Sequence, residues 1–129
     1  KEIIVQEIEC PLFVPIVEEG LETSEIASLV VQMYLKKINN NTFDTLILGC
    51  THYPMLIKLI KKFINSNVHI VDTGLSICNQ LNTMLSTYSF NKCNNSINEY
   101  YVSDLPYRFN DLASKFLNQE IHHVEQVQL

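Results

Sequence analysis

Residues 45–54 restrict the possible folds of this chain more than any other segment does. They begin with an apolar run at 45–48, flanked by Asp44 and Gly49, that has the length and composition of a short buried strand. Pro54 then lies where the first turn of a helix would begin, because proline is well tolerated at that position. A buried strand that leads directly into a helix is the unit from which α/β folds are built.

Strand patterns and helix patterns alternate along the rest of the chain. Short runs rich in β-branched or aromatic residues predict strands at residues 3–8, 45–48, 68–71, 100–102 and 122–127. Apolar residues at helical spacing predict helices that begin after Thr23 or Ser24, after Pro54, at Leu75, and at Pro106 or Tyr107. This order predicts an α/β fold with a largely parallel sheet flanked by helices.

Each predicted helix has one apolar face that should turn toward the core. The inward residues are Ile26, Leu29, Val30, Met33 and Tyr34 in the first helix, Leu56, Leu59, Ile60 and Phe63 in the second, Ile77, Leu81, Met84 and Leu85 in the third, and Phe109, Leu112, Ala113 and Phe116 in the fourth. The run Asn39, Asn40 and Asn41 should break the first helix. We further expect Asp72 to end a strand and cap the third helix, and Cys78 to be a small core residue.

The composition excludes several classes of protein. Hydrophobic residues make up 47% of the chain and charged residues 18%, which is ordinary for a globular protein. The net charge is −5 and the lysines form no concentrated stripe, so no nucleic-acid partner is expected. No apolar run approaches the roughly 20 residues that span a bilayer, and no signal peptide opens the chain. We therefore expect a cytoplasmic protein without a membrane partner.

The four cysteines, Cys10, Cys50, Cys78 and Cys93, lie far apart in the sequence. A structural zinc site usually takes its ligands from closely spaced pairs, and a disulfide framework is typical of small secreted chains. Because neither pattern is present, we expect reduced thiols and no metal, with Cys93 incidental in a polar loop. The chain also starts at Lys1 in a strand-like run, which indicates a fragment of a longer protein.

Cys50, Thr51 and His52 follow one another where the predicted strand ends. Reactive side chains at the carboxyl end of a strand occupy the usual site crevice of open α/β sheets. The start of a helix beside them would favour a thiolate or a bound carboxylate, because its free amide groups and positive dipole end lie there. The alternative is a buried cysteine that happens to end a strand. The neighbouring hydroxyl and imidazole favour the functional interpretation.

Two segments carry a resemblance to a known family. The run FDTLILGCTHYPML at 43–56 and the run CPLFVPIVEEG at 10–20 resemble motifs of glutamate racemases, which belong to the aspartate/glutamate racemase superfamily. The similarity continues more weakly through VDTG at 71–74 and the tail at 100–117. It covers only about the C-terminal half of a typical member. It implies an incomplete two-domain fold, with residues 1–74 in the second α/β domain and 75–129 returning to the first.

The resemblance also implies a chemistry. Members of the family interconvert L- and D-glutamate without a cofactor, using two cysteines on opposite faces of the substrate. One is a thiolate base and the other a thiol acid, and the D-glutamate serves peptidoglycan synthesis. On that analogy Cys50 is one of the two thiols, His52 assists it, and Thr51 binds the substrate together with Cys50. Glu19 is the expected third catalytic residue, with Glu18 as a close alternative.

One departure from the family pattern limits this assignment. The family's first cysteine, in a Cys-Asn-Thr motif, and its Asp-Ser-Gly loop do not occur in this chain. We therefore expect the chain to be inactive alone, to need an N-terminal half as partner besides glutamate, and to form a homodimer. Two alternatives stay open: a non-catalytic remnant or interaction module with the racemase fold, and a hydrolase in which Cys50 attacks an acyl carbon.

Overall fold

The computed structural model describes residues 2–38, 43–88, 97–104 and 106–128. The predicted helix break at Asn39–Asn41 and the loop cysteine Cys93 therefore lie outside the described residues. Contacts divide the chain into two compact units, residues 1–88 and 89–129, each of which is described by itself. The predicted division at residue 74 concerns the two domains of a complete racemase and stays a prediction.

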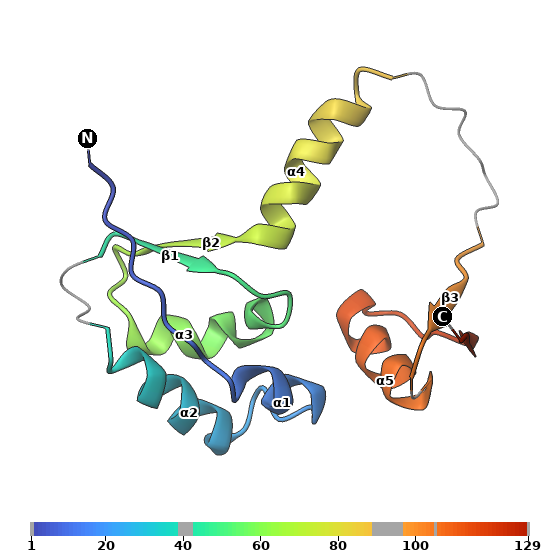
Figure 1. Ribbon diagram of the computed structural model, residues 1–129, viewed down its shortest axis with the longest axis horizontal. Helices are drawn as coiled ribbons and strands as arrows, with labels where there is room; N and C mark the ends of the chain where they lie inside the picture. Colours follow the sequence, from blue (N-terminus) through green and yellow to red (C-terminus); the bar gives the residue numbers. More distant parts are fainter. Residues whose placement is uncertain (1, 39–42, 89–96, 105, 129) are drawn as a thin grey trace. The chain divides into compact units, whose positions relative to one another are not determined.

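The first unit contains most of the helices and one small sheet (Figure 1). Its elements, in chain order, are α1 (Phe13–Glu18), α2 (Glu25–Leu35), β1 (Thr45–Leu48), the 3₁₀-helix η1 (Tyr53–Leu56), α3 (Ile57–Phe63), β2 (His69–Asp72) and α4 (Thr73–Leu85). Strands β1 and β2 pair in parallel, with Thr45 opposite His69 and Leu48 opposite Asp72. The predicted strand–helix alternation and the parallel pairing are confirmed, so the carboxyl ends of both strands lie at the same edge.

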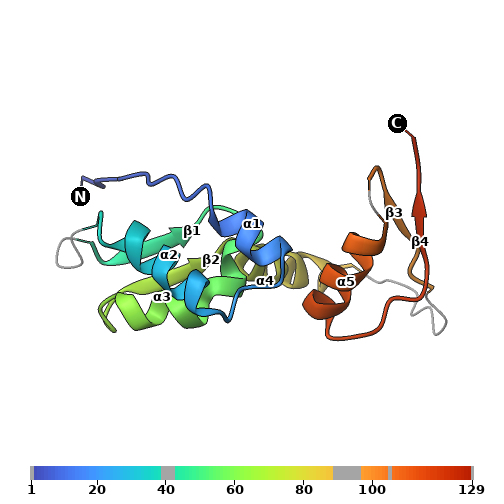
Figure 2. The same ribbon diagram turned by 90° about the horizontal axis from the view of Figure 1, so that it is seen from below.

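Helices α1, α2 and α3 cover one face of this sheet (Figures 1 and 2). The core between them is apolar and contains Phe13, Ile16 and Val17 of α1, Ala27, Val31, Tyr34 and Leu35 of α2, and Leu56, Leu59 and Ile60 of η1 and α3. The predicted inward residues Leu56, Leu59 and Ile60 are thus confirmed. Pro54 lies at the start of η1, so the expected helix opens as a 3₁₀ turn and continues as α3.

The predicted inward face of α2 is wrong in part. Ser24 caps the helix as expected, because its Oγ accepts a hydrogen bond from the Ala27 amide at 3.1 Å. Tyr34 is buried, but Ile26, Leu29 and Met33 are exposed, while three residues not predicted are buried: Ala27, Val31 and Leu35. The helix is apolar on more than one side, so periodicity alone does not identify the packed face. The small Ala27 lies on the packed side, where a short side chain lets neighbouring helices approach closely.

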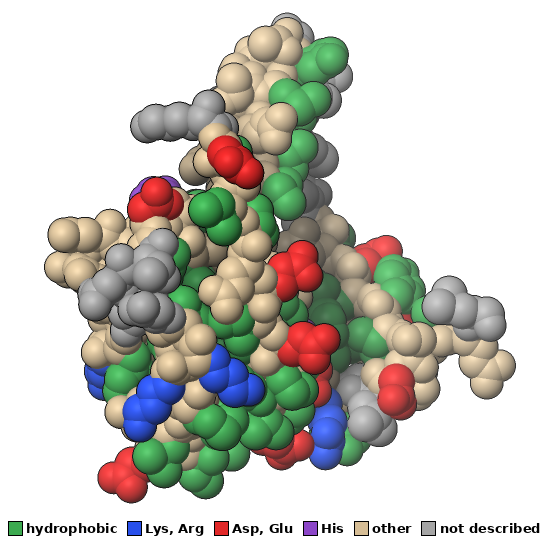
Figure 3. Space-filling view, turned by 60° about the vertical axis from the view of Figure 1, so that its left-hand side comes forward, with side chains coloured by type: hydrophobic (Ala, Val, Ile, Leu, Met, Phe, Trp, Pro, Cys, Tyr) green, Lys and Arg blue, Asp and Glu red, His purple; other side chains and the backbone are tan. Residues whose placement is uncertain are grey.

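The third predicted helix forms, but its predicted burial is wrong. Asp72 caps α4 as expected, with Oδ1 accepting a hydrogen bond from the Leu75 amide at 3.1 Å. No residue of α4 is buried. Its apolar side chains and Cys78 are exposed, and Figure 3 shows apolar side chains on its surface. The pattern gave the correct helix, but within the described part of its unit α4 follows β2 without a second helix packed over it.

The predicted strand at residues 3–8 is also wrong. Residues 2–10 have no regular secondary structure, and Ile3, Ile4 and Val5 are exposed. A strand is stabilised by a hydrogen-bonded partner. In the described sheet β1 pairs with β2, and residues 3–8 pair with neither.

The second unit is a strand–helix–strand motif. It contains β3 (Tyr100–Val102), α5 (Pro106–Leu117) and β4 (Val124–Gln126), with β3 and β4 parallel and Tyr100 opposite Val124. Ile121 is buried, and its amide donates a hydrogen bond to Ser114 Oγ at 3.2 Å, which connects the end of α5 to the segment before β4. The two strands and the helix predicted for this region are confirmed.

Candidate active site

The turn after β1 carries the predicted site residues. Cys50 lies two residues beyond the end of β1. Its carbonyl accepts a hydrogen bond from the Tyr53 amide at 3.2 Å, and the His52 carbonyl accepts one from the Met55 amide at 3.1 Å. These bonds hold the turn compact between the strand and η1. Cys50 and His52 therefore lie at the carboxyl edge of the parallel strand pair, where α/β proteins commonly place their sites.

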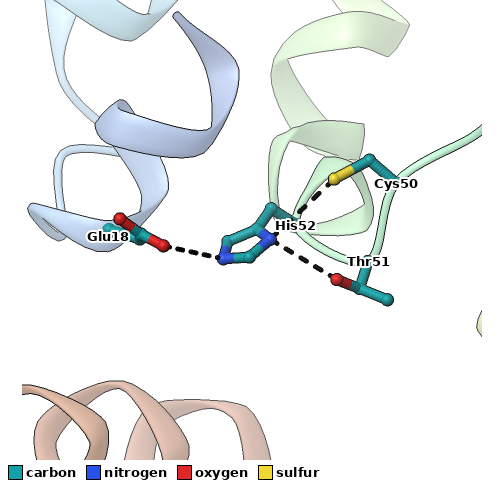
Figure 4. Close-up of polar contacts among 4 residues, drawn as sticks. All are labelled: Glu18, Cys50, Thr51 and His52. Atoms are coloured by element: carbon teal, nitrogen blue, oxygen red, sulfur yellow. Dashed lines mark hydrogen bonds and ion pairs between the residues drawn. The ribbon is translucent and has the colours of Figure 1, made fainter. Parts of the chain in front are cut away.

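His52 is the centre of the polar contacts at this edge (Figure 4). Its Nδ1 lies 3.9 Å from Cys50 Sγ and 3.4 Å from Thr51 Oγ1. On the other side of the ring, Nε2 lies 3.5 Å from Glu18 Oε1. The structure thus brings together Cys50, Thr51 and His52, which the sequence predicted, with Glu18, which the sequence offered as the alternative to Glu19.

This arrangement gives the imidazole two different neighbours. When Nε2–H donates to the Glu18 carboxylate, Nδ1 of a neutral ring is the acceptor. That acceptor faces the Cys50 thiol and the Thr51 hydroxyl. His52 can then take a proton from Cys50, which leaves a thiolate beside an imidazolium that Glu18 stabilises. The side chains of His52 and Glu18 are 23% and 51% exposed, so solvent screens the pair and its contribution to stability is small, below about 1 kcal/mol.

The acidic residues of the first helix differ in how the structure places them. Glu18 is the last residue of α1, and Glu19 follows it as the C-cap, with its amide donating to the Pro15 carbonyl at 3.0 Å. Both are exposed. The ion pair with His52 is made by Glu18, the alternative that the sequence left open. The predicted catalytic role of Glu19 stays a prediction.

An aromatic cluster connects α1 to the turn that carries His52. The Phe13 ring contacts Tyr34 and Tyr53 edge-on, each at 5.2 Å between ring centroids. Burial raises the pKa of Tyr53, with smaller contributions from Cys10, Cys50 and Tyr34, so this phenol stays protonated at neutral pH. Sequence reasoning missed this cluster. The available signal was the spacing, because an aromatic residue follows both Cys10 and Cys50 at the third position.

The start of α4 closes the same edge of the sheet. Thr73 follows the end of β2, and its hydroxyl donates a hydrogen bond to the Leu48 carbonyl at 3.2 Å. Leu48 is the last residue of β1 and lies opposite Asp72 in the sheet. Asp72 itself is the cap of α4 that the sequence predicted, through its bond from the Leu75 amide.

Other candidate features do not form sites in the part of the chain that the structure describes. Within the described ranges, no three His, Cys, Asp or Glu side chains gather closely enough to hold a metal ion. His122 and His123 are both exposed next to β4. Among the described helices, none is both long and apolar enough to cross a bilayer.

Comparison with known proteins shows a consistent relationship, although no protein-family model matches the chain. A glutamate racemase from Syntrophus aciditrophicus is 35% identical over 122 residues, which are 93% of this chain and 45% of that protein. The crystal structure of a glutamate racemase from Francisella tularensis, in complex with D-glutamate, is 34% identical with a TM-score of 0.77. The match covers 92% of this chain and 45% of that one.

A glutamate racemase isoform from Bacillus anthracis has a TM-score of 0.85 at 29% identity, over 98% of this chain and 48% of its own. The chain thus spans about half the length of the curated relatives that it matches. Both the sequence similarity and the structural similarity extend over both compact units. The chain is therefore a relative of the glutamate racemases that corresponds, over nearly its whole length, to a little under half of one of them.

Proposed function

We propose that this chain is the C-terminal portion of a cofactor-independent glutamate racemase. The complete enzyme interconverts L- and D-glutamate in the bacterial cytoplasm and supplies D-glutamate for peptidoglycan synthesis, and hence for cell-wall growth and cell shape. The observation that carries the proposal is His52 between Cys50 and Glu18 at the carboxyl edge of the β1–β2 pair. The D-glutamate bound by the Francisella tularensis relative supports the substrate.

In this proposal Cys50 is one of two thiols that exchange a proton with the α-carbon of glutamate. A thiol must be deprotonated to act as a base, and His52 Nδ1 lies in position to accept its proton. Thr51 offers a hydroxyl to the substrate's carboxylate or amino group from the same turn. Of the two carboxylates that the sequence left open, the ion pair supports Glu18 as the group that orients His52.

The second thiol has to come from outside these residues. A base on one face of the α-carbon removes the proton, and an acid on the opposite face returns one. Cys10 has a structural role, because its carbonyl accepts a hydrogen bond from the Phe13 amide at 3.0 Å. Burial raises the pKa of the Cys10 thiol, and the charge of Lys37 acts in the opposite direction. We therefore propose that an N-terminal half, the part of the relatives that this chain does not match, supplies the other cysteine.

The apolar face of α4 supports the need for such a partner. Its side chains Ile77, Leu81, Met84 and Leu85 are exposed in this unit. Apolar surface of this extent is usually covered by another protein surface. We propose that the N-terminal half covers it in the complete enzyme, and that the chain alone covers it by forming a homodimer.

Complementation tests this proposal directly. The 129-residue chain is purified alone and together with a co-expressed N-terminal half of a related racemase, and both are assayed for conversion of L-glutamate. We expect no racemisation from the chain alone, a dimer by light scattering, and activity when the other half is present. A compact monomer that racemises glutamate unaided contradicts both the partner and the two-thiol assignment. Stable assembly of the halves without turnover would instead favour a non-catalytic remnant.

The two carboxylates are separated in the same complemented enzyme. Glu18→Gln removes the charge that faces His52 and should lower kcat, whereas Glu19→Gln should have a smaller effect. The matched amide substitution keeps the shape of each side chain, so a difference reports the charge. A larger loss in Glu19→Gln would restore the original expectation from the sequence.

A further inference from the structure

Helix α1 is short and weakly stabilised by its own residues. It has six residues, its N-cap Leu12 provides no side-chain hydrogen bond, and Pro15 within its first turn has no amide hydrogen. Isolated helices of this length do not persist in water, so contacts from elsewhere must hold α1 in place. Glu18, at its far end, is half exposed and is positioned by the helix rather than by its own packing.

Tyr34 of α2 supplies the missing cap. Its hydroxyl accepts a hydrogen bond from the Leu12 amide at 3.3 Å, across 22 positions of sequence. The Leu12 amide is one of the helix-opening donors that normally need a side-chain partner. The Tyr34 ring is buried and also meets Phe13 edge-on, with an interplanar angle of 90°. One side chain therefore fixes both the first amide and the first aromatic ring of α1.

Phe13 carries this constraint to the site. The Phe13 ring also meets Tyr53, with an interplanar angle of 88°, and Tyr53 is the residue after His52. A continuous chain of contacts from Tyr34 through Phe13 to Tyr53 thus helps to set the position of α1 relative to the His52 turn. Ile16 and Val17, buried on the same helix, add apolar packing.

We propose that Tyr34 is a positioning residue for the Glu18–His52 pair, acting through Phe13 and the first amide of α1. Tyr34 touches neither glutamate nor the reacting thiol in this assignment. Its effect on racemisation rests on the function proposed above, whereas its effect on the geometry of the pair does not. Loss of the hydroxyl frees the start of α1, and the carboxylate at its other end then moves relative to His52 Nε2.

The test reads the His52 ring directly, in the 129-residue chain and without any assay of activity. The ¹⁵N chemical shift of Nε2 is recorded for the parent chain, Glu18→Gln, Tyr34→Phe and the double variant. Glu18→Gln should move the shift because Nε2 loses its charged neighbour. Tyr34→Phe should move it in the same direction by a smaller amount, and should add nothing in the Glu18→Gln background.

Two further variants complete the design. Tyr107→Phe removes a hydroxyl from an exposed ring in the second unit and should leave the Nε2 signal unchanged. Phe13→Leu keeps an apolar side chain and the Tyr34 hydroxyl but loses the ring edges, so it should also move the signal, and it keeps the proposal testable if Tyr34→Phe unfolds. An unchanged signal in Tyr34→Phe, or an equal shift with and without Glu18, overturns the proposal.

A kinetic arm links the geometry to catalysis. In the complemented enzyme, Tyr34→Phe should lower kcat, by up to about 100-fold, with little change in KM, because misplacement of a supporting group acts mainly on the reacting geometry. If the complemented parent enzyme is inactive, the proposed function fails, but the Nε2 measurement still decides the positioning role. A normal kcat in Tyr34→Phe would show that Tyr34 has no effect on catalysis and only a structural role.

Discussion

Two strand–helix connections in the first unit have the same order and very different surroundings. Strand β1 leads through η1 into α3, and the residues Leu56, Leu59 and Ile60 of that connection are buried. Strand β2 leads directly into α4, whose thirteen residues include none that is buried. Both helices carry apolar side chains at helical spacing. The comparison shows that an amphipathic pattern specifies a helix with an apolar face but not the surface that covers it.

The same two connections also differ in chemistry. The turn after β1 holds Cys50 and His52 with a side-chain partner from α1, whereas β2 ends at a capping carboxylate, Asp72, which is bonded to the helix that follows it. Cys78 lies exposed on α4, whereas Cys50 is partly buried. The turn after β1 therefore has the features of a site, and the end of β2 has those of a helix start.

The largest expected difference between the two connections is in catalysis. In the complemented racemase, Cys50→Ala should lower turnover in both directions by at least roughly 100-fold, because it removes a general acid or base. Cys78→Ala, the matched loss of a thiol from α4, should leave turnover unchanged. Racemase assays from L- and D-glutamate measure both. Appreciable turnover by Cys50→Ala in both directions would remove Cys50 from the mechanism.

The second largest expected difference between the two connections is in their contribution to stability. Leu56→Ala empties a fully buried position and should lower the free energy of unfolding by about 2–5 kcal/mol. Leu81→Ala, the same change on exposed α4, should alter it by no more than about 0.5 kcal/mol. Urea denaturation of the chain at a concentration where it is monomeric measures this. Leu81→Ala should instead weaken assembly with the N-terminal half, and equal losses in the two variants would show that α4 is packed in the chain alone.

The helix caps should show the same difference between a packed helix and an exposed one, with smaller changes in free energy. Ser24→Ala removes the cap of packed α2 and should lower the free energy of unfolding by about 1 kcal/mol. Asp72→Ala removes an equivalent cap from α4. Its effect should be local, with faster hydrogen exchange at the Leu75 amide and a smaller change in global stability, because α4 contributes little packing. Slower exchange at Leu75 in Asp72→Ala would contradict the cap itself.

The smallest expected effect concerns two thiols that take no part in the proposed reaction. Burial raises the pKa of Cys10, whereas Cys78 is exposed. At a concentration where the chain is monomeric, iodoacetamide should therefore modify Cys78 first at pH 8. Cys10 should react only as the pH rises further, because more of the Cys10 thiol stays protonated. Mass spectrometry of peptides follows both sites, with a urea-unfolded sample as the control. Faster modification of Cys10 in the folded chain would place its thiol at the surface.

The sequence alone predicted the elements near the site better than their packing. The strand at 45–48, the helix start at Pro54 and the cap at Asp72 depend on local chemistry, and all three are present. The strand at 3–8 was wrong because strand formation depends on a partner elsewhere, and the face of α2 was wrong because that helix is apolar on several sides.

The site residues likewise fall into those that local sequence predicts and those that depend on distant contacts. Cys50, Thr51 and His52 are consecutive, so the sequence itself brought them together. The contribution of Glu18 depends on where helix α1, distant in the sequence, ends. Glu18 and Glu19 are adjacent, so their side chains differ in direction by about 100° around the helix axis. The role of the Phe13 ring depends on contacts from α2 and η1 that no local pattern records.

The hydrogen bond from the Thr73 hydroxyl to the Leu48 carbonyl joins the two connections mechanically. Thr73 opens α4, and Leu48 is followed after one glycine by Cys50. A shift of the first residue of α4 would therefore act, through this hydrogen bond, on the end of β1 that precedes the Cys50 turn. A partner that packs on α4, as proposed above, would therefore be linked to the Cys50 turn through this one hydrogen bond.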